Sequence, residues 1–397
     1  MTESNDLEEL HGRPIEWAED SDGGVLTRRD GVFLLGVAAL AATFVYDYTQ
    51  LSGAERLVGD WNPQEFEWLF VLSLLIFGLY VIVPLIQKRE LTRQYWRKLR
   101  TDRLALFSLA WLTLLFALGL LAPLIYGTLT TDTTALHNPP FGFRIIDILA
   151  GGCAGTVSNG YCHGSLAHPL GTTGNGEDVL AYTVTGMRVA LAVTLITGTI
   201  IVPLGVAVGT IAATAGGRVD EILMRYVDLQ QTVPAFFAYI LVQYIYYPSL
   251  LLIIIIFGLL NWGGLARHIR SDVLRTREAG FVRAAKSAGI GQLQLIRRHL
   301  VPNTWDTVVT AATFQLPMLV IMEATLSYLM ISSGGGTQSL GDPRVNSWGQ
   351  LIAVGMREFP TYWWVPVIPA ITLLLTVVAI SRLGDTLRDV LDLQAES

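Results

Sequence analysis

Repeated apolar runs of membrane-spanning length constrain this chain more than any other feature. Of its 397 residues, 52% are hydrophobic and only 15% are charged, whereas a soluble domain carries about 25% charged residues. Several runs exceed the roughly 18 mostly apolar residues that can cross the hydrocarbon core of a bilayer. The sequence therefore predicts an all-α polytopic membrane protein. We expect eight spanning helices, at residues 31–49, 66–87, 104–127, 182–214, 222–246, 248–266, 304–330 and 362–383.

Basic residues concentrate in three connecting segments, 87–103, 215–225 and 264–303. Lys and Arg in short loops stay on the cytoplasmic side of a membrane, and the eight-helix arrangement puts all three segments on that side. Arginines beside the first and last spans join them, which predicts a multi-pass protein of the cell membrane with both termini cytoplasmic. The first thirty residues are acidic and polar, unlike a secretory signal.

Two long loops, 128–181 and 331–361, then face the outer side. The first contains both cysteines, Cys153 and Cys162. On an oxidising side the two could form a disulfide, although spacing alone does not establish the geometry. Two free thiols are the alternative. A metal site that adds His163 and His168 is a third interpretation, but the spacing matches no common zinc pattern.

The segment 281–303 is basic and helix-prone, and it lies between two apolar spans. Its Ala-rich start favours a helix, and Gly289 and Gly291 allow a sharp turn. Leu293, Ile296 and Leu300 follow at helical spacing and predict one apolar face, before Pro302 ends the helix. Taken alone, such a segment could also be an amphipathic helix lying on anionic lipid.

Ionisable residues within spans are costly and often functional. Glu323 lies deep in the seventh span, where it either lines a pathway or is held structurally by Ser327. Asp228 is expected to form a local i, i+3 ion pair with Arg225. Arg188 is expected near the outer start of the fourth helix, where it reaches lipid headgroups or contacts a substrate-delivery protein.

ATP hydrolysis by this chain is not expected. A phosphate-binding loop needs a Gly-Lys pair within G-x-x-x-x-G-K-[ST], and no lysine follows a glycine (Lys88, Lys98, Lys286). The chain is therefore expected to be no enzyme, to hold no cofactor or metal and to bind no nucleic acid.

From residue 168 onward, and in the helix at 104–127, the chain resembles the second permease subunit of dipeptide, oligopeptide and nickel ABC importers. The resemblance rests on motifs that occur in the order of that family. They are His168-Pro169-Leu170-Gly171-Thr172, Gly186 with Arg188, Gly216-Gly217 with Asp220-Glu221, Ala284-Ala285 with Gly289 and His299-Leu300-Val301-Pro302-Asn303, Glu323-Ala324 with Leu326-Ser327, Ser347-Trp348-Gly349, and Leu383-Gly384-Asp385.

The resemblance implies the type I ABC-importer transmembrane fold, with a six-helix core and two additional N-terminal helices. It implies five regions along the chain. They are an acidic tail at 1–30, the additional helices and a basic linker at 31–103, the first core helix and outer loop at 104–181, the transmembrane domain at 182–384 with its coupling loop at 272–303, and a C-terminal tail at 385–397.

In that family the coupling loop carries ATP-driven motion into the membrane. The implied partners are a second homologous permease, two cytoplasmic ABC ATPase subunits and an extracellular solute-binding protein. One departure stands out, because Arg283 occupies a position where the family usually has Glu. The expected coupling residues are Arg283, Ala284, Ala285, Gly289, Arg297 and Pro302, and the expected pathway or gating residues are Glu323 and Arg188.

Two other functions compete with an importer. A secondary transporter driven by an ion gradient would need intramembrane carboxylates or broken helices in paired repeats, and only Glu323 lies deep in a span. A membrane scaffold that transports nothing is the second. Co-purification with ATPase subunits and a solute receptor would separate the three.

Overall fold

The computed structural model describes residues 28–50, 63, 65–87, 89–126, 131–246, 249–329 and 346–395. The boundary expected between the spans at 222–246 and 248–266, the tail before residue 28 and residues 331–345 of the second outer loop lie outside these residues. The chain divides into two compact units at residues 62 and 63. Helix α1 (Arg28–Gln50) belongs to the first unit, and all other described elements belong to the second.

Seven helices in the described part of the chain are long and apolar enough to span a membrane. They confirm the predicted polytopic helical fold, with ends mostly within three residues of those expected. The seven are Arg29–Thr49, Glu65–Gln87, Arg103–Tyr126, Val179–Ala215, Leu250–Arg277, Asp306–Tyr328 and Trp364–Arg388.

The expected span at 222–246 is divided into α7 (Gly217–Thr232) and α8 (Ala235–Gln243). The break falls at Pro234, which has no N–H to donate and which restricts the residue before it to extended conformations. Val233 accordingly has φ −95° and ψ 108°. The expected sixth span is also longer than predicted. Helices α9 (Leu250–Leu260) and α10 (Gly263–Arg277) follow each other with only Asn261 and Trp262 between them.

Helix α6 (Val179–Ala215) is the centre of the second unit, and its buried residues outnumber its exposed ones. It packs most extensively against α10, and also contacts α2 (Glu65–Phe77), α5 (Arg103–Tyr126) and α14 (Trp305–Tyr328). The approach to α10 is close, since a Cβ on Gly209 would lie 2.9 Å from the Cβ of Ile269. Helix α16 (Trp364–Ala395) packs on α5, α14 and α15 (Trp348–Met356).

Two π turns interrupt the helices, and each is followed by a proline two residues later. The first, η1 (Gly78–Ile82), leads into α3 (Val83–Gln87), which contains Pro84. The second, η3 (Ile296–Leu300), leads into α13 (Val301–Asn303), which contains Pro302. A π turn changes the hydrogen-bond register, so the backbone can continue although proline donates no hydrogen bond.

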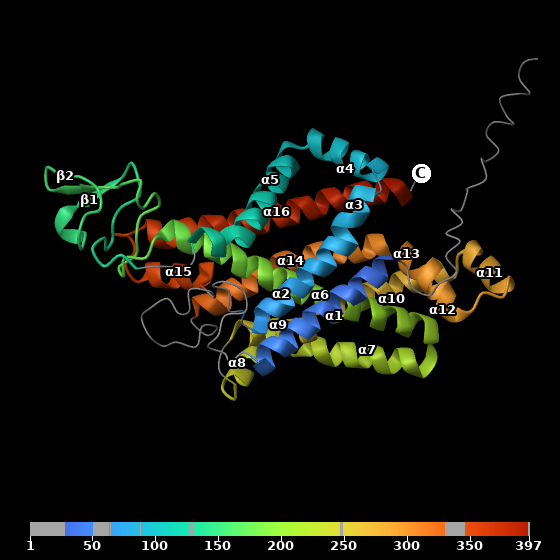
Figure 1. Ribbon diagram of the computed structural model, residues 1–397. Helices are drawn as coiled ribbons and strands as arrows, with labels where there is room; N and C mark the ends of the chain where they lie inside the picture. Colours follow the sequence, from blue (N-terminus) through green and yellow to red (C-terminus); the bar gives the residue numbers. More distant parts are fainter. Residues whose placement is uncertain are drawn as a thin grey trace, which may run out of the picture. The chain divides into compact units, whose positions relative to one another are not determined.

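The second unit has two distinct ends (Figure 1). One, the sheet end, comprises residues 131–178 and α15. Its three short antiparallel strands, in the order β1-β3-β2, add to the predicted all-α fold a small sheet that was not expected. The strands are β1 (Arg144–Ile146), β2 (Val157–Ser158) and β3 (Tyr161–His163), and a 3-10 turn, η2 (Asp147–Leu149), follows β1.

The other end, the short-helix end, comprises residues 263–308 and α7. Its smallest elements are α11 (Gly280–Ser287), α12 (Gln292–Leu295), η3 and α13. In Figure 1 the sheet and α15 lie at the left of the second unit, and α11 and α12 lie at the right. The long helices α6 and α16 run between the two ends.

Candidate functional site

At the short-helix end, Gly289 makes the turn that the sequence predicts. Its φ of 81° lies in the left-handed region, where a residue with a side chain is less stable by about 1–2 kcal/mol. Gly291 has an extended conformation, with φ −64° and ψ 150°, and begins α12 as its N-cap. A Cβ on either glycine would meet no atom within 4 Å. Backbone conformation, and not crowding, therefore distinguishes Gly289 from Gly291.

The predicted apolar face of the second short helix is wrong in part. Leu300 is buried and Ile296 packs against the core, but Leu293 is 69% exposed. Leu295 is buried in its place. The π turn explains the change, because its i→i+5 hydrogen bonds widen the turn and bring Leu295 and Leu300 toward the same side. Leu293 is instead an apolar side chain on the surface.

The expected coupling residues mostly lie on the surface of this end. Arg283, Ala284, Gly289 and Arg297 are exposed, and Ala285 is half-buried against the core. Pro302 does not end the segment as predicted. It lies in the first turn of α13, a position that tolerates proline, and the helical conformation ends at Thr304, with φ −107° and ψ 9°.

Two ion pairs join α10 to α7. Arg270 donates from Nε and a terminal nitrogen to the two carboxylate oxygens of Asp220, both at 2.5 Å. This guanidinium holds the pKa of Asp220 below its usual value. Arg267 donates to Asp228. The predicted Asp228–Arg225 pair is therefore wrong, and Arg225 pairs instead with Glu221 at 2.6 Å.

Further polar contacts join α10 to α6 and α14. Asp272 is buried, accepts from Thr307 of α14 at 2.9 Å and pairs with Arg275 at 2.7 Å. Arg277 donates to the carbonyl of Ala213, near the last residue of α6, at 2.9 Å. An open hollow of about 520 Å³ lies beside these contacts, lined by Leu274, Arg277, Glu278 and Arg283.

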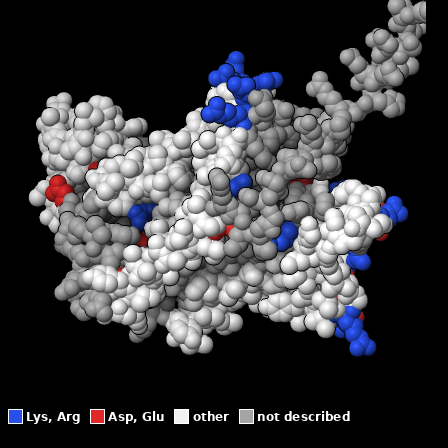
Figure 2. All heavy atoms as spheres, turned by 45° about the vertical axis from the view of Figure 1, so that its right-hand side comes forward, with Lys and Arg blue, Asp and Glu red and all other residues white. Residues whose placement is uncertain are grey.

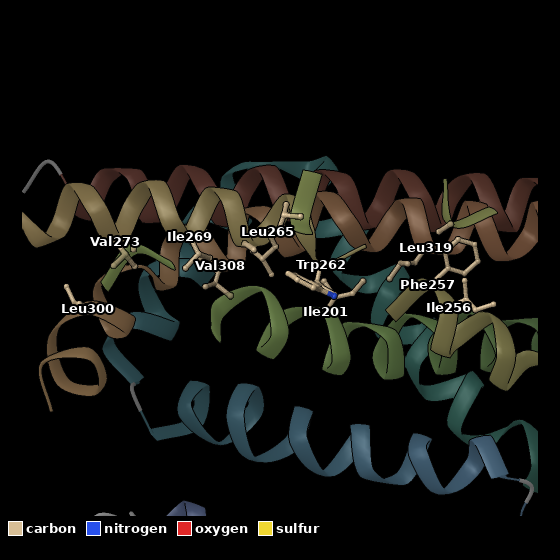
Figure 3. Close-up of a cluster of buried hydrophobic side chains, with 14 of the residues drawn as sticks. Ile201, Ile256, Phe257, Trp262, Leu265, Ile269, Val273, Leu300, Val308 and Leu319 are labelled. Carbon is tan, nitrogen blue, oxygen red and sulfur yellow. The ribbon is translucent and has the colours of Figure 1, made fainter. Parts of the chain in front are cut away.

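One continuous apolar core connects the short helices to the spans. It includes Val282 of α11, Leu295 of α12 and Leu300 of η3, all buried, together with residues of α6, α9, α10 and α14. Figure 3 shows its side chains in a row from Leu300 and Val273 to Ile256 and Phe257. Because protein interiors are close-packed, a displacement of α11 or α12 would be transmitted to α10 and α14.

At the other end, Glu323 of α14 is 2% exposed and accepts a hydrogen bond from Ser327 at 2.7 Å. It lies one residue before Ala324, against which α15 packs closely. A Cβ on Gly349 of α15 would overlap the carbonyl oxygen of Ala324. The carboxyl therefore lies at the junction of α14 and α15, away from the short helices.

Helix α15 is held to α6 by a tryptophan. Trp348 is 1% exposed and its indole N–H donates to the carbonyl of Thr183 at 2.8 Å. The ring fills the space left by Gly186, where a Cβ would overlap it. Ser347 caps the helix, and Gln350 three residues later completes a sequence signal for a helix start. That signal lies in the segment interpreted from the sequence as an outer loop.

The expectation that Arg188 lies at the surface is wrong. Helix α6 begins at Val179, so Arg188 lies about two and a half turns inside it. Its side chain is 14% exposed and pairs with Glu67 of α2 at 2.6 Å. The ring of Phe70 lies 5.8 Å from the guanidinium. The additional helix α2 thus packs on the core through a buried ion pair.

In the sheet end, Cys153 and Cys162 form a disulfide, which leaves neither thiol for a metal. His163 contacts Ser158 at 2.9 Å, and His168 contacts Asp178, the N-cap of α6, at 2.8 Å. No group of three or more His, Cys, Asp or Glu side chains among the described residues is arranged to hold a metal ion. The metal interpretation is therefore wrong for these four residues.

Buried polar contacts stabilise the sheet end and join it to α16. Glu177 is buried and accepts from the Thr173 hydroxyl at 2.7 Å, and its burial raises the pKa of this carboxyl. Trp364 of α16 donates from its indole nitrogen to the carbonyl of Thr172 at 3.1 Å. His137 contacts Glu358 at 2.7 Å and stacks on Tyr362.

Comparison with known proteins identifies the family. The family described as "Binding-protein-dependent transport system inner membrane component" matches residues 205–395. A second family, "N-terminal TM domain of oligopeptide transport permease C", matches residues 90–140, which include α5 and nearly all of α4 (Arg89–Thr101).

Individual proteins similar to this chain are also transport permeases. The oligopeptide transport system permease protein OppC of Haemophilus influenzae is 34% identical over 225 residues, which cover 57% of this chain and 70% of that protein. A putative peptide permease protein of Brucella suis biovar 1 is 33% identical over 71% of this chain and 87% of its own length. The dipeptide transport system permease protein DppC of Bacillus subtilis is 29% identical over 76% and 85%.

These matches confirm the resemblance and the type I importer fold predicted from the sequence. The relatives are permease subunits of peptide transporters. The chain belongs to the family of binding-protein-dependent transport system inner membrane components.

Proposed function

We propose that this chain is the permease subunit of an ABC importer for dipeptides, oligopeptides or a related small solute. It forms one half of the translocation pathway and contains no ATPase site of its own. A second, homologous permease forms the other half. Two ABC ATPase subunits supply the energy, and an extracellular solute-binding protein delivers the solute. The relatives, which are named as oligopeptide, peptide and dipeptide permeases, support the solute class.

The observation that carries the proposal is the construction of the short-helix end. It presents exposed side chains, such as Leu293 and Arg297, for a partner to contact. On its inner side, Leu295 and Leu300 are buried in the same apolar core as residues of α10 and α14. A partner that displaces these short helices would therefore displace the spanning helices with them.

In this mechanism ATP-driven closure of the ATPase subunits moves residues 281–303, and the spans switch between inward- and outward-open arrangements. The coupling residues are Arg283, Ala284, Ala285, Gly289, Arg297 and Pro302. The short-helix end and both termini face the cytoplasm, which the basic connecting segments support. The sheet end then faces the solute-binding protein on the outer side.

Glu323 is the residue that we propose for the pathway or its gate. Its burial at the α14–α15 junction supports this role, because an ionisable group within a span is costly unless it is used. Arg188 has a different role in this arrangement. Its pairing with Glu67 supports the packing of α2 on the core and not a direct contact with solute or receptor.

Two glycines offer a matched test of coupling. Gly289→Val forces a β-branched side chain into a left-handed conformation, whereas Gly291→Val adds the same atoms to an extended one. Uptake of a labelled dipeptide and tripeptide into cells is expected to fall to background for Gly289→Val. It should stay within about twofold of the original for Gly291→Val, with equal amounts of both variants in the membrane.

Purification of the tagged chain in mild detergent tests the assembly. We expect a second permease, ABC ATPase subunits and a solute-binding protein to accompany it. If the chain instead purified alone, and its uptake followed an ion gradient and not ATP, the importer function would be refuted in favour of a secondary transporter. An absence of any uptake together with the absence of partners would favour a scaffold.

A further inference from the structure

Helix α4 (Arg89–Thr101) connects two spanning helices, Glu65–Gln87 and Arg103–Tyr126. A helix in this position lies at the boundary between membrane and water. It is itself far too polar to cross the membrane, since RELTRQYWRKLRT contains six charged residues. Neither the coupling mechanism nor the pathway proposed above uses this helix.

Four arginines of α4 form a single stripe. Arg89, Arg93, Arg97 and Arg100 are all exposed. Their spacing of four, four and three residues puts them within about 80° of one another around the helix axis, at about 100° per residue. Leu99 points away from this stripe and is buried, and α4 packs on α5 and α16. One side of α4 is therefore attached to the bundle while the arginine stripe faces outward.

The basic side chains at the top of Figure 2 lie at the height of α4 in Figure 1 and protrude from the surface. Trp96 lies beside the stripe, is 39% exposed, and has the guanidinium of Arg100 at 4.8 Å from its ring centre. Tryptophan is enriched where a membrane meets water. The stripe and the indole thus combine a cationic surface with an interfacial anchor.

Asp102 directly follows α4, and its carboxylate is bound by groups of α5 and α16. Asp102 accepts from the backbone N–H of Leu104 at 2.9 Å and from Ala105 at 3.3 Å, as the cap of α5. It also pairs with Arg382 of α16 at 3.3 Å. This carboxylate therefore stabilises the junction of α4, α5 and α16, and the exposed arginines of α4 extend beyond it.

From this arrangement we propose that the α4 stripe binds the phosphate groups of anionic phospholipids. Guanidinium groups bind phosphate through paired hydrogen bonds, and a basic helix beside a span is attracted to an anionic membrane surface. The bound headgroups fix α4 in the interface, and with it the ends of α5 and α16 that Asp102 joins. This inference does not depend on which solute the protein carries.

The test measures lipid bound to the delipidated full chain in mild detergent, by native mass spectrometry during titration with phosphatidylglycerol or phosphatidylcholine. The original chain is expected to prefer phosphatidylglycerol. Arg89→Gln with Arg97→Gln should lower that affinity about tenfold or more, since each basic residue near an anionic surface contributes about a fivefold preference. Arg218→Gln with Arg225→Gln, two exposed arginines of α7, is the control and should leave it unchanged.

Two further measurements keep the test decisive if the double variant inserts poorly. Arg89→Lys with Arg97→Lys retains the charges and should retain most of the preference. Raising the salt concentration should weaken phosphatidylglycerol binding by the original chain, because salt screens exposed charges. Equal phosphatidylglycerol affinity in the α4 and α7 variants would refute the proposal. Unchanged lipid binding with loss of co-purifying protein subunits would also refute it and would make α4 a protein-docking surface.

Discussion

The two ends of the second unit are held together by different kinds of contact. At the sheet end, a disulfide and a buried carboxyl join residues within the loop, and two indole N–H groups join the loop to α16 and α15 to α6. At the short-helix end, the short helices share an apolar core with the spans, and α7 is joined to α10 by ion pairs that are exposed or only partly buried, such as Arg267–Asp228, whose side chains are 46% and 64% exposed.

Exposed ion pairs contribute little and exchange readily with water, whereas buried hydrogen bonds are costly to leave unmade. We therefore expect the sheet end, including α15, to move as a rigid body, while the short-helix end can adjust its polar contacts as it moves. This division of stiffness is what a coupled transporter needs, and the following variants test it.

The largest loss of stability is expected from Arg188→Ala. Its removal leaves the Glu67 carboxyl buried without its 2.6 Å partner, which costs about 3–5 kcal/mol. Thermal unfolding of the purified chain in detergent measures the change. Glu67→Gln combined with Arg188→Met removes both charges and should recover part of the loss. If the single and double variants unfolded alike, the pair would not hold α2 to the core.

The second-largest loss of stability is expected from removing the disulfide. Replacing Cys153 and Cys162 together by Ser should destabilise the sheet end by about 2–3 kcal/mol, because the closed loop is short. Amide hydrogen exchange should rise in β2, β3 and their connection and remain unchanged in α11 and α12. An equal rise at the short-helix end would show that the two ends are not independent.

A smaller effect is expected from the ion pairs of α10. Asp228→Asn should cost less than about 1 kcal/mol, because both partners are exposed. Asp220→Asn should cost more, since it disrupts the half-buried contact in which Arg270 donates two hydrogen bonds to Asp220.

The contribution of Asp220 also depends on pH. Because the pKa of Asp220 is lowered in the fold, its contribution to stability is present at neutral pH and is lost as the pH falls through that lowered pKa. Unfolding temperatures measured against pH for both variants test this ranking.

The smallest change in stability is expected from Glu177→Gln, and it is a gain and not a loss. Burial raises the pKa of Glu177, so its contribution to stability is full below the ordinary glutamate pKa and is lost as the pH rises through the raised value. Glu177→Gln keeps an acceptor for Thr173 and removes the charge. It should slightly raise the unfolding temperature at neutral pH and leave it unchanged in acid. A lower unfolding temperature at neutral pH would show that the ionised form is needed.

Much of the fold could be predicted from the sequence. Hydropathy located the spans, because membrane insertion depends on the summed character of about 20 successive residues. It did not predict the division of the span at 222–246, where Pro234 acts on only one or two residues. Helix α15 was also missed, although Ser347 and Gln350 carry a recognisable capping signal.

The site residues were harder to predict. The partly buried contacts of Asp272 with Thr307 and of Arg277 with the Ala213 carbonyl join α10 to α14 and α6, and no local sequence pattern predicts them. The error at Leu293 has a similar cause, since the π turn changes which residues share a face. The turn at Gly289 was predicted correctly, because glycine is the residue that most readily adopts the left-handed backbone conformation.

The sequence by itself thus determined the membrane-spanning character, the turn at Gly289 and the family motifs. These depend on properties of neighbouring residues, which are present before the chain folds. Only the tertiary structure decided the partners of the charged groups. Arg188 pairs with Glu67, 121 positions away, and Asp228 pairs with Arg267, 39 positions away. Long side chains pair with whichever opposite charge packing brings within reach, and packing is a property of the whole fold.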